Sequence, residues 1–250
     1  MNSFIGKVSI VTGATSGIGR TTAVLLAKRG SKVVVAGRRE SEGAEVVAEI
    51  TKAGGDAIFV KTDVQNESEV KNLVDKTVSH YGRVDVAFLN AGVFRFNPIG
   101  DQTDDDLTNQ IDINIKGAYF GIKHLSKAFG ESGGSIVLTS SVVADIGFAG
   151  ASAYSLTKGA INTLTRTAAV ELVGANIRVN SVAPGPIWTE GVGTMAGSRE
   201  NAESMMAAMV PMGRLGEEIE VAEAAVFLAS DAASFITGQV LNVDGGVGIR

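Results

Sequence analysis

The sequence has no cysteine, only two histidines and one tryptophan among its 250 residues. The absence of cysteine excludes disulfide bonds, a thiolate nucleophile and thiolate metal ligands, but it leaves the cellular compartment open. His80 and His124 lie in separate amphipathic segments, and neither has a second histidine or a suitably spaced carboxylate close to it. We therefore expect no metal site.

Long apolar runs and an excess of positive charge are also missing. No apolar run approaches the roughly 20 residues that a membrane-spanning helix needs. The first apolar segment starts by about Lys7, which leaves no room for a signal peptide. A formal net charge of -5 argues against sequence-independent binding of nucleic acid, which relies on clustered Lys and Arg. We expect a cytoplasmic protein with neither a membrane nor a nucleic-acid partner.

Glycine, by contrast, occurs 31 times, and 45% of the residues are hydrophobic. Short β-rich runs alternate with amphipathic segments along the whole chain. The predicted strands are 8–11, 32–36, 57–60, 84–89, 134–140, 177–183 and 239–243. The predicted helices are 17–29, 41–53, 66–81, 103–129, 152–173 and 217–230. This alternation predicts an α/β fold with a Rossmann-like, doubly wound parallel sheet of about seven strands and helices on both faces.

The chain shows neither an internal repeat nor a Pro- or Ser-rich linker, so we expect residues 1–250 to form a single domain. One segment, 185–213, interrupts the alternation and is long for a connection in a compact domain. Because it follows directly on a predicted strand, we interpret it as a substrate loop or lid.

A glycine-rich turn separates the first predicted strand from the first predicted helix. Glycines let the backbone approach a phosphate closely, and the following helix start favours an anion. The spacing is Gly-x-x-x-Gly-x-Gly, which differs from the general Gly-x-Gly-x-x-Gly fingerprint. The alternative interpretation is a turn without a ligand. The predicted cofactor contacts are Gly13, Thr15, Ser16, Gly17, Ile18 and Gly19.

The end of the second predicted strand indicates which dinucleotide is bound. An acidic residue at this position would hold the adenosine ribose hydroxyls and select NAD. Here the strand instead runs into Gly37, Arg38 and Arg39. Guanidinium groups offer a phosphate both charge and forked donors. The pattern favours NADP(H), with NAD(H) still possible and with two solvated loop charges as the alternative interpretation.

Ser141 closes a strand, and Tyr154 and Lys158 follow it at one helical turn from each other. Residues four apart share a helix face, so the ammonium group would lie beside the phenol. An adjacent positive charge favours the phenolate, and we therefore expect Lys158 to lower the pKa of Tyr154. The result would be a proton donor for the reduction of a ketone near neutral pH.

Together with Asn90-Ala91-Gly92, Asn114 and Pro184-Gly185, these motifs resemble the short-chain dehydrogenase/reductase family over about residues 6–246. The resemblance implies that Tyr154 is the general acid/base and that Ser141 positions the carbonyl oxygen. It further implies that Lys158 binds the nicotinamide ribose and that Asn114 holds a water that relays protons. It adds cofactor contacts from Asp63, Val64, Asn90, Ala91, Gly92, Tyr154, Lys158, Pro184, Gly185, Ile187 and Thr189.

Some of these residues also have simpler interpretations. Asp63 is a good helix cap, Pro184 and Gly185 suit a plain turn, and Asn114 is as often a surface residue. An apolar substrate pocket is expected from Val93, Phe94, Phe96, Val143, Ile146, Phe148 and Trp188. Arg95 beside it would hold a substrate carboxylate or serve as a rim charge.

The expected activity is that of an NADPH-dependent carbonyl reductase or alcohol dehydrogenase for a small-molecule substrate. Residues 125–134 and 171–176 are poor in the basic residues that an acidic carrier protein would meet. A 3-oxoacyl-(acyl-carrier-protein) reductase and a glucose-type sugar dehydrogenase are the alternatives, and a non-catalytic dinucleotide sensor is a remote one. Family members of this size are commonly tetramers, and apolar residues of 152–173 and Val240–Val243 are compatible with a homotetramer.

Overall fold

The computed structural model describes residues 4–249, which build one large parallel sheet and a small two-stranded one. The large sheet has seven strands in the order β3-β2-β1-β4-β5-β6-β9, so the order reverses between β1 and β4. This confirms the predicted doubly wound, Rossmann-like α/β fold. The strands are β1 (Val8–Thr12), β2 (Lys32–Gly37), β3 (Asp56–Lys61), β4 (Val86–Leu89), β5 (Gly134–Thr139), β6 (Ile177–Pro184) and β9 (Val240–Val243).

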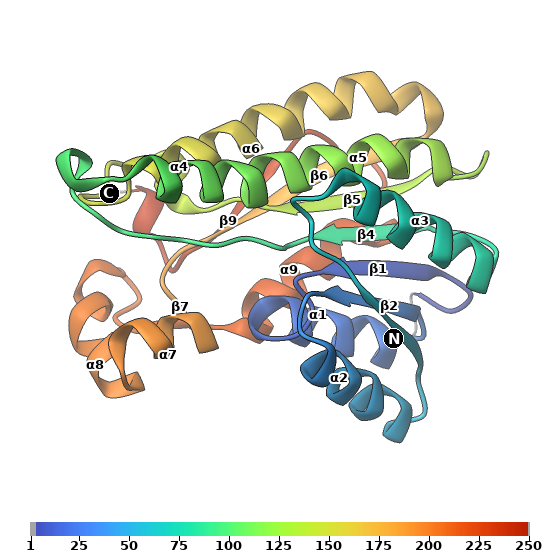
Figure 1. Cartoon of the computed structure of the whole chain (residues 1–250), viewed down its shortest axis with the longest axis horizontal. Coiled ribbons are helices and arrows are strands. Elements are labelled where there is room, and N and C mark those ends of the chain that lie inside the picture. The colour runs from blue at the N-terminus through green and yellow to red at the C-terminus, as the bar shows by residue number, and fades with distance from the viewer. Residues whose placement is uncertain (1–3, 250) are drawn as a thin grey trace.

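Helices cover both faces of the sheet because strand side chains alternate between two apolar cores. On β2, Val33 and Val35 belong to a core with α1, α2 and α9, while Val34 belongs to a core with α3, α5 and α6. Figure 1 shows these two layers, with α1, α2 and α9 on one side of the sheet and α5 and α6 on the other. The helices are α1 (Gly17–Lys28), α2 (Glu40–Lys52), α3 (Glu67–Tyr81), α5 (Gly117–Ala128), α6 (Ser152–Leu172) and α9 (Glu218–Ala229).

Two predicted elements were wrong in part. The strand predicted at 84–89 begins only at Val86, and the Asp85 carboxylate before it accepts the backbone N–H of Val8 at 2.9 Å. The continuous helix predicted at 103–129 is three pieces. These are α4 (Asp104–Gln110), the π-helical turn η2 (Ile111–Lys116) and α5.

The segment 185–213 is more regular than a loop. It contains β7 (Ile187–Trp188), α7 (Glu190–Ala196) and α8 (Arg199–Met206), and β7 pairs with β8 (Gly216–Glu217) in the small sheet. In Figure 1 the two short helices, drawn in orange, stand apart from both helical layers. Short 3-10 turns complete the chain at Ile99–Asp101 (η1), Val142–Ala144 (η3), Val173–Ala175 (η4), Ala207–Met209 (η5), Asp231–Ala233 (η6) and Val247–Ile249 (η7).

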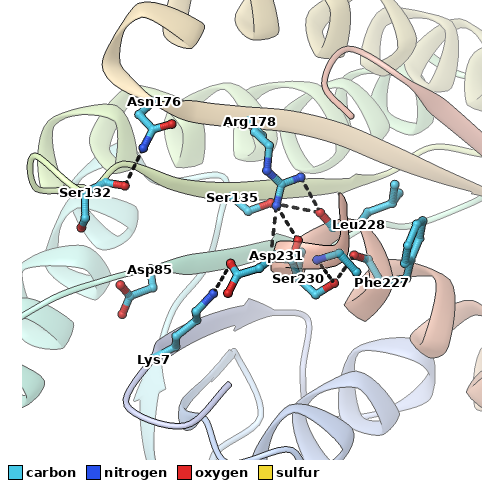
Figure 2. Close-up of polar contacts among 12 residues, drawn as sticks. Lys7, Asp85, Ser132, Ser135, Asn176, Arg178, Phe227, Leu228, Ser230 and Asp231 are labelled. Atoms are coloured by element: carbon cyan, nitrogen blue, oxygen red, sulfur yellow. Dashed lines mark hydrogen bonds and ion pairs between the residues drawn. The ribbon is translucent and has the colours of Figure 1, made fainter. Parts of the chain in front are cut away.

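Arg178 at the start of β6 fastens the last turn of α9 to the sheet. Its guanidinium donates to the carbonyls of Leu228 at 2.8 Å and Ser230 at 3.0 Å, and more weakly to those of Ala229 and Ile236. Figure 2 shows this cluster, with the Ser135 hydroxyl directed at the same Leu228 carbonyl. The last carbonyls of a helix have no partner within it, and a cation there is favourable. Within residues 4–249, no helix is long and apolar enough to cross a membrane.

Candidate active site

The carboxyl ends of the central strands lie side by side, and this edge gathers the predicted site residues. The register pairs Thr12 at the end of β1 with Ala36 of β2 on one side and Leu89 of β4 on the other. β5 and β6 end next to them, with Thr139 opposite Val182. Open α/β sheets bind their ligands at this edge, where the strand order reverses.

The glycine turn after β1 requires glycine at two positions for different reasons. A Cβ on Gly19 would lie 2.3 Å from the carbonyl oxygen of Gly13, so the first turn of α1 can lie directly on the loop. At Gly17 a Cβ would make only ordinary contacts, 3.9 Å from Glu218 and Thr189, but the φ of +58° disfavours other residues. Gly19 therefore serves packing, while Gly17 serves the backbone conformation of the turn.

Asn90 at the end of β4 joins three strand ends. Its amide nitrogen donates to the carbonyls of Thr12 at 3.3 Å and Gly13 at 3.4 Å, and its amide oxygen accepts from the Thr139 hydroxyl at 3.2 Å. The backbone N–H groups of Asn90 and Ala91 donate in turn to the Thr12 hydroxyl. Asn90 thus holds the glycine turn and the β4 loop in one position.

The end of β2 carries charge that matches a phosphate. Gly37 has no side chain, and a Cβ there would lie 2.7 Å from the Thr15 methyl group, so a carboxylate at this position would displace Thr15. Arg39 lies against the same threonine and donates to its hydroxyl from Nε at 3.3 Å and from Nη2 at 3.2 Å. Arg38 is exposed beside it.

A cavity of about 340 Å³ runs over this edge of the sheet. The residues fit a phosphate-bearing dinucleotide, because bare backbone, small side chains and two guanidinium groups share one wall. Most of the predicted cofactor contacts line it, namely Gly13, Thr15, Ser16, Gly17, Ile18, Arg38, Arg39, Asp63, Val64, Asn90, Ala91, Gly92 and Thr189. Five further lining residues were not among the predicted contacts: Gly37, Thr62, Val93, Ile113 and Gly191.

Two of the missed residues had a visible signal and the others had little. Gly37 comes one residue and Thr62 two residues after the end of a predicted strand, where the sheet presents its ligand edge. Ile113 and Gly191 come from η2 and α7, whose positions depend on tertiary packing. The alternative interpretation of Asp63 as a helix cap was wrong, because α3 has Asn66 at its N-cap position, and the Asp63 carboxylate instead accepts the Gln65 N–H at 3.1 Å in the turn before the helix.

The predicted residues of the sixth strand end do not line this cavity. The Gly185 N–H donates to the Val243 carbonyl at 3.0 Å, which joins β6 to β9. The Ile187 side chain is 6% exposed and packs into the core beside Gly216. Thr189 differs from them, because it both lines the cavity and caps α7 through the Val192 N–H at 3.2 Å.

Ser141, Tyr154 and Lys158 lie together beside this cavity, with the Lys158 ammonium next to the lining residue Gly92 and the Ser141 hydroxyl hydrogen-bonded to Tyr154. Ser141 follows β5, and its hydroxyl is within 3.5 Å of the Pro184 carbonyl. On α6, the Lys158 ammonium lies 5.5 Å from the centre of the Tyr154 ring and donates to the Thr139 carbonyl at 2.7 Å.

Asn114 is buried in η2 and binds the loop that follows β4. Its amide accepts the Val93 N–H and donates to the Val93 carbonyl, both at 2.8 Å. It also donates to the Thr157 hydroxyl at 3.0 Å, which ties it to α6. Its amide oxygen and the Lys158 ammonium both border the space above Gly92. A π-turn inside a helix is a frequent feature of functional sites, because it turns one side chain out of register.

The pKa values of the pair differ from the expectation. Burial raises the pKa of Tyr154 to about 12, and the Ser141 hydroxyl acts in the opposite direction. Burial also lowers the pKa of Lys158 to about 8. The expected lowering of the tyrosine pKa by the lysine is absent because the ammonium lies over the ring and donates to Thr139 instead of to the phenol oxygen.

An aromatic wall stands next to the Tyr154 ring. Phe94 and Phe96 lie edge-on to it at 6.2 and 6.0 Å between ring centres, and Phe148 packs on Phe96 at 5.8 Å. The place of the other expected pocket residues in a substrate pocket stays a prediction. Val93 lines the cofactor cavity, Val143 and Ile146 pack in a cluster with Val210, and Trp188 lies under the Arg199 guanidinium.

Arg95, at the rim of this wall, already has a carboxylate partner. Its Nε lies 3.3 Å from the Asp106 carboxylate in the first turn of α4. The first turn of α4 is acidic, and Thr103 is the cap that accepts the Asp106 N–H.

Comparison with known proteins assigns this arrangement to a family. Residues 13–248 match the family model described as Enoyl-(Acyl carrier protein) reductase. The structure of a short-chain type dehydrogenase/reductase from Mycobacterium marinum superposes with a TM-score of 0.95 at 32% identity, over 100% of this chain and 98% of that one. The chain belongs to the short-chain dehydrogenase/reductase family. It is therefore an oxidoreductase of a family that uses NAD or NADP.

Two curated relatives within this short-chain dehydrogenase/reductase family have named activities. The cis-4-hydroxycyclohexanecarboxylate dehydrogenase of Sinomonas cyclohexanicum is 42% identical over 98% of this chain and 97% of its own length. The 3-oxoacyl-(acyl-carrier-protein) reductase FabG of Chlamydia pneumoniae is 35% identical over 98% of each chain.

Proposed function

We propose that the protein is an NADPH-dependent carbonyl reductase and alcohol dehydrogenase for ketones or secondary alcohols that carry an apolar ring. The observation that carries this proposal is the aromatic wall of Phe94, Phe96 and Phe148 against the Tyr154 ring. Aromatic faces and edges favour a flat apolar group beside the reacting carbon.

In this proposal Asn114, Ser141, Tyr154 and Lys158 form the catalytic set. When bound, the cofactor supplies the hydride or accepts it. The Tyr154 phenol, which its pKa of about 12 keeps protonated at neutral pH, gives its proton to the carbonyl oxygen. The Ser141 hydroxyl donates a hydrogen bond to the same oxygen and fixes its position. Lys158 offers a positive charge to the phenolate that remains.

Asn114 supports this set through the contacts that it makes. By joining Val93 to Thr157, it keeps the β4 loop at a fixed distance from α6. The predicted water relay stays a prediction.

The preference for NADPH rests on Gly37, Arg38 and Arg39. The last residue of β2 is Gly37 and not an acidic residue, and the Thr15 methyl occupies the space that a side chain there would need. Replacing Arg38 by Ser should raise the KM for NADPH about tenfold or more, the worth of a charged hydrogen bond, and change that for NADH less than twofold. Equal effects on both cofactors would contradict the assignment.

The relatives divide between two substrate classes. One relative is named for a secondary alcohol on a six-membered ring that also bears a carboxylate. Here Arg95 is paired with Asp106, so we expect the ring to matter more than the carboxylate. The second candidate is a carrier-bound 3-oxoacyl chain, favoured by the FabG relative. The stretches 125–134 and 171–176 are poor in basic residues and weigh against it.

Absorbance at 340 nm tests the proposal directly. We expect NADPH oxidation with cyclohexanone, 4-oxocyclohexanecarboxylate and aryl ketones at similar kcat/KM, and far less with a 3-oxoacyl thioester or with glucose in reverse. Tyr154→Phe should abolish turnover and leave NADPH binding within about twofold of wild type. A variant that still turns over, or a wild-type protein that binds NADPH and reduces none of these ketones, would refute the proposal.

A further inference from the structure

Glu190, the first residue of the lid helix α7, reaches across to the end of β2. Its carboxylate lies 3.3 Å from Nη1 of Arg39, although the two residues are 151 positions apart. Arg39 and then the Ser16 hydroxyl hydrogen-bond to it and hold its pKa below the ordinary value, so it is charged at neutral pH. The lid is thus tied to the wall of the cofactor cavity.

Arg39 makes further contacts besides the one with Glu190. Besides Glu190 and the Thr15 hydroxyl, it faces the Glu42 carboxylate of α2 at 3.5 Å. Two carboxylates therefore surround the guanidinium that the proposed function assigns to the 2′-phosphate of the cofactor. A phosphate arriving at Arg39 meets their repulsion as well as the attraction of the arginine.

We propose that Glu190 competes with the 2′-phosphate of the cofactor for Arg39, so that the lid sets how strongly the protein prefers NADP over NAD. The inference rests on the proposed role of Arg39 in phosphate binding. Glu190 is a specificity-determining residue in this view, and it acts from an element outside the dinucleotide-binding half of the sheet.

The ion pair between Glu190 and Arg39 also connects the phosphate site to the substrate pocket. Gly191 follows Glu190 directly, and a Cβ on it would lie 3.4 Å from the Phe94 ring. Release of Glu190 from Arg39 therefore frees the end of α7 that borders the aromatic wall. A cofactor with a 2′-phosphate would loosen this end of the lid, and one without it would leave the tie in place.

The test uses Glu190→Gln with Glu42→Gln as the matched control, because both remove one carboxylate from Arg39 and only the first lies on the lid. Binding of adenosine 2′,5′-bisphosphate and of 5′-AMP is measured by calorimetry, which needs no turnover. For Glu190→Gln we expect the Kd of the bisphosphate to fall about two- to fivefold, the range of exposed ion pairs, and that of 5′-AMP to stay unchanged. Hydrogen exchange of amides 191–197 in the free protein should rise in Glu190→Gln and not in Glu42→Gln.

The outcomes separate this inference from the proposed function. The competition would be overturned if Glu190→Gln changed the Kd values of both nucleotides equally. It would also be overturned if this variant changed neither the Kd of the bisphosphate nor the exchange of amides 191–197. If wild-type protein binds the bisphosphate no more tightly than 5′-AMP, the NADP preference fails and the competition fails with it. A raised exchange in Glu190→Gln would still establish the tie between lid and β2. Lack of ketone turnover leaves all of these measurements valid.

Discussion

Lys158 and Tyr154 share one turn of α6, and burial moves their pKa values in opposite directions. Lys158 is 3% exposed, and its pKa falls to about 8, while that of Tyr154 rises to about 12. In both cases burial disfavours the charged form. At neutral pH the free protein therefore carries a buried ammonium that is disfavoured by desolvation, and one carbonyl accepts its hydrogen bond.

The lowered pKa of Lys158 predicts that the stability of the fold depends on pH. Below pH 8 the folded protein must keep a buried charge that the unfolded chain holds in water, so the lowered pKa destabilises the fold. As the pH rises from 8 toward 10.5, that cost disappears, and it amounts to about 3 kcal/mol at most. The raised pKa of Tyr154 acts only above pH 10 and does not overlap with most of this window.

Urea unfolding of wild type and Lys158→Met, without nucleotide, measures the effect. Between pH 7 and 10 the free energy of unfolding of the wild type should rise relative to that of the variant, because Met has no proton to lose. If the free energies of unfolding of the two proteins changed in parallel over this pH range, burial would not destabilise the ammonium.

At this scale the sequence predicted the spacing of the candidate residues but not their electrostatics. The one-turn spacing of Tyr154 and Lys158 places both on one helix face, as the structure shows. The direction of the tyrosine pKa shift was wrong, because spacing carries no information on burial. The Arg39–Glu190 pair was also beyond prediction, since it joins elements that only the folded chain brings together.

Among the elements, the long ones followed from local pattern and the short ones did not. Strands such as β2 are continuous apolar runs between turn residues, and their bounds differ from the prediction by one or two residues. The helices α7 and α8 have seven and eight residues, too few to be stable alone. They form because the Thr189 and Ser198 hydroxyls cap them and the buried Ala202 docks α8 on the fold.

The π-turn η2 likewise arises from tertiary contacts. Nothing in the run Ile111–Lys116 breaks a helix, and the sequence predicted one through it. The amide of Asn114, within this turn, binds both backbone groups of Val93 in the loop after β4. A helical pattern cannot show such a demand from a partner loop.

The hydrogen bonds from Arg178 to the end of α9 lead to a prediction about the stability of the fold. Arg178→Met keeps the apolar stem and removes every donor to the carbonyls of Leu228 and Ser230. Buried acceptors without partners cost about 1–3 kcal/mol, and we expect a loss of roughly 2–3 kcal/mol in the free energy of unfolding. Arg166→Met, at an exposed position of α6, is the matched control and should change it by less than about 0.5 kcal/mol. Denaturant midpoints of the two variants that coincide would show that these hydrogen bonds do not stabilise the fold.

For the whole molecule, the alternation of strands and helices was enough to predict the doubly wound sheet. Right-handed crossovers leave few ways to arrange such a chain, which is why topology followed from element order. What the alternation does not show is how the outer surface is used. Among residues 4–249, β9 ends the sheet and pairs only with β6, so one side of it has no neighbouring strand.

Apolar side chains near this edge and on α6 are exposed, and we propose that they form the interfaces of a homotetramer. Phe235 before β9 is fully exposed, Leu241 on β9 is 38% exposed and Val170 on α6 is 78% exposed. An exposed sheet edge with apolar side chains is a ready surface for pairing with another chain. A second copy of this chain offers the same edge, as a two-fold interface requires.

Light scattering coupled to size exclusion tests this proposal. We expect the wild type to elute with about four times the 25.8 kDa mass of the chain. A Phe235→Asp/Leu241→Glu variant should dissociate to a smaller species, because carboxylates cannot be buried unpaired in an apolar interface. Val78→Glu, a charge placed on the exposed face of α3, should leave the assembly intact. A wild-type monomer would contradict the homotetramer. A Phe235→Asp/Leu241→Glu variant that keeps its mass while Val78→Glu loses it would place the interface away from β9.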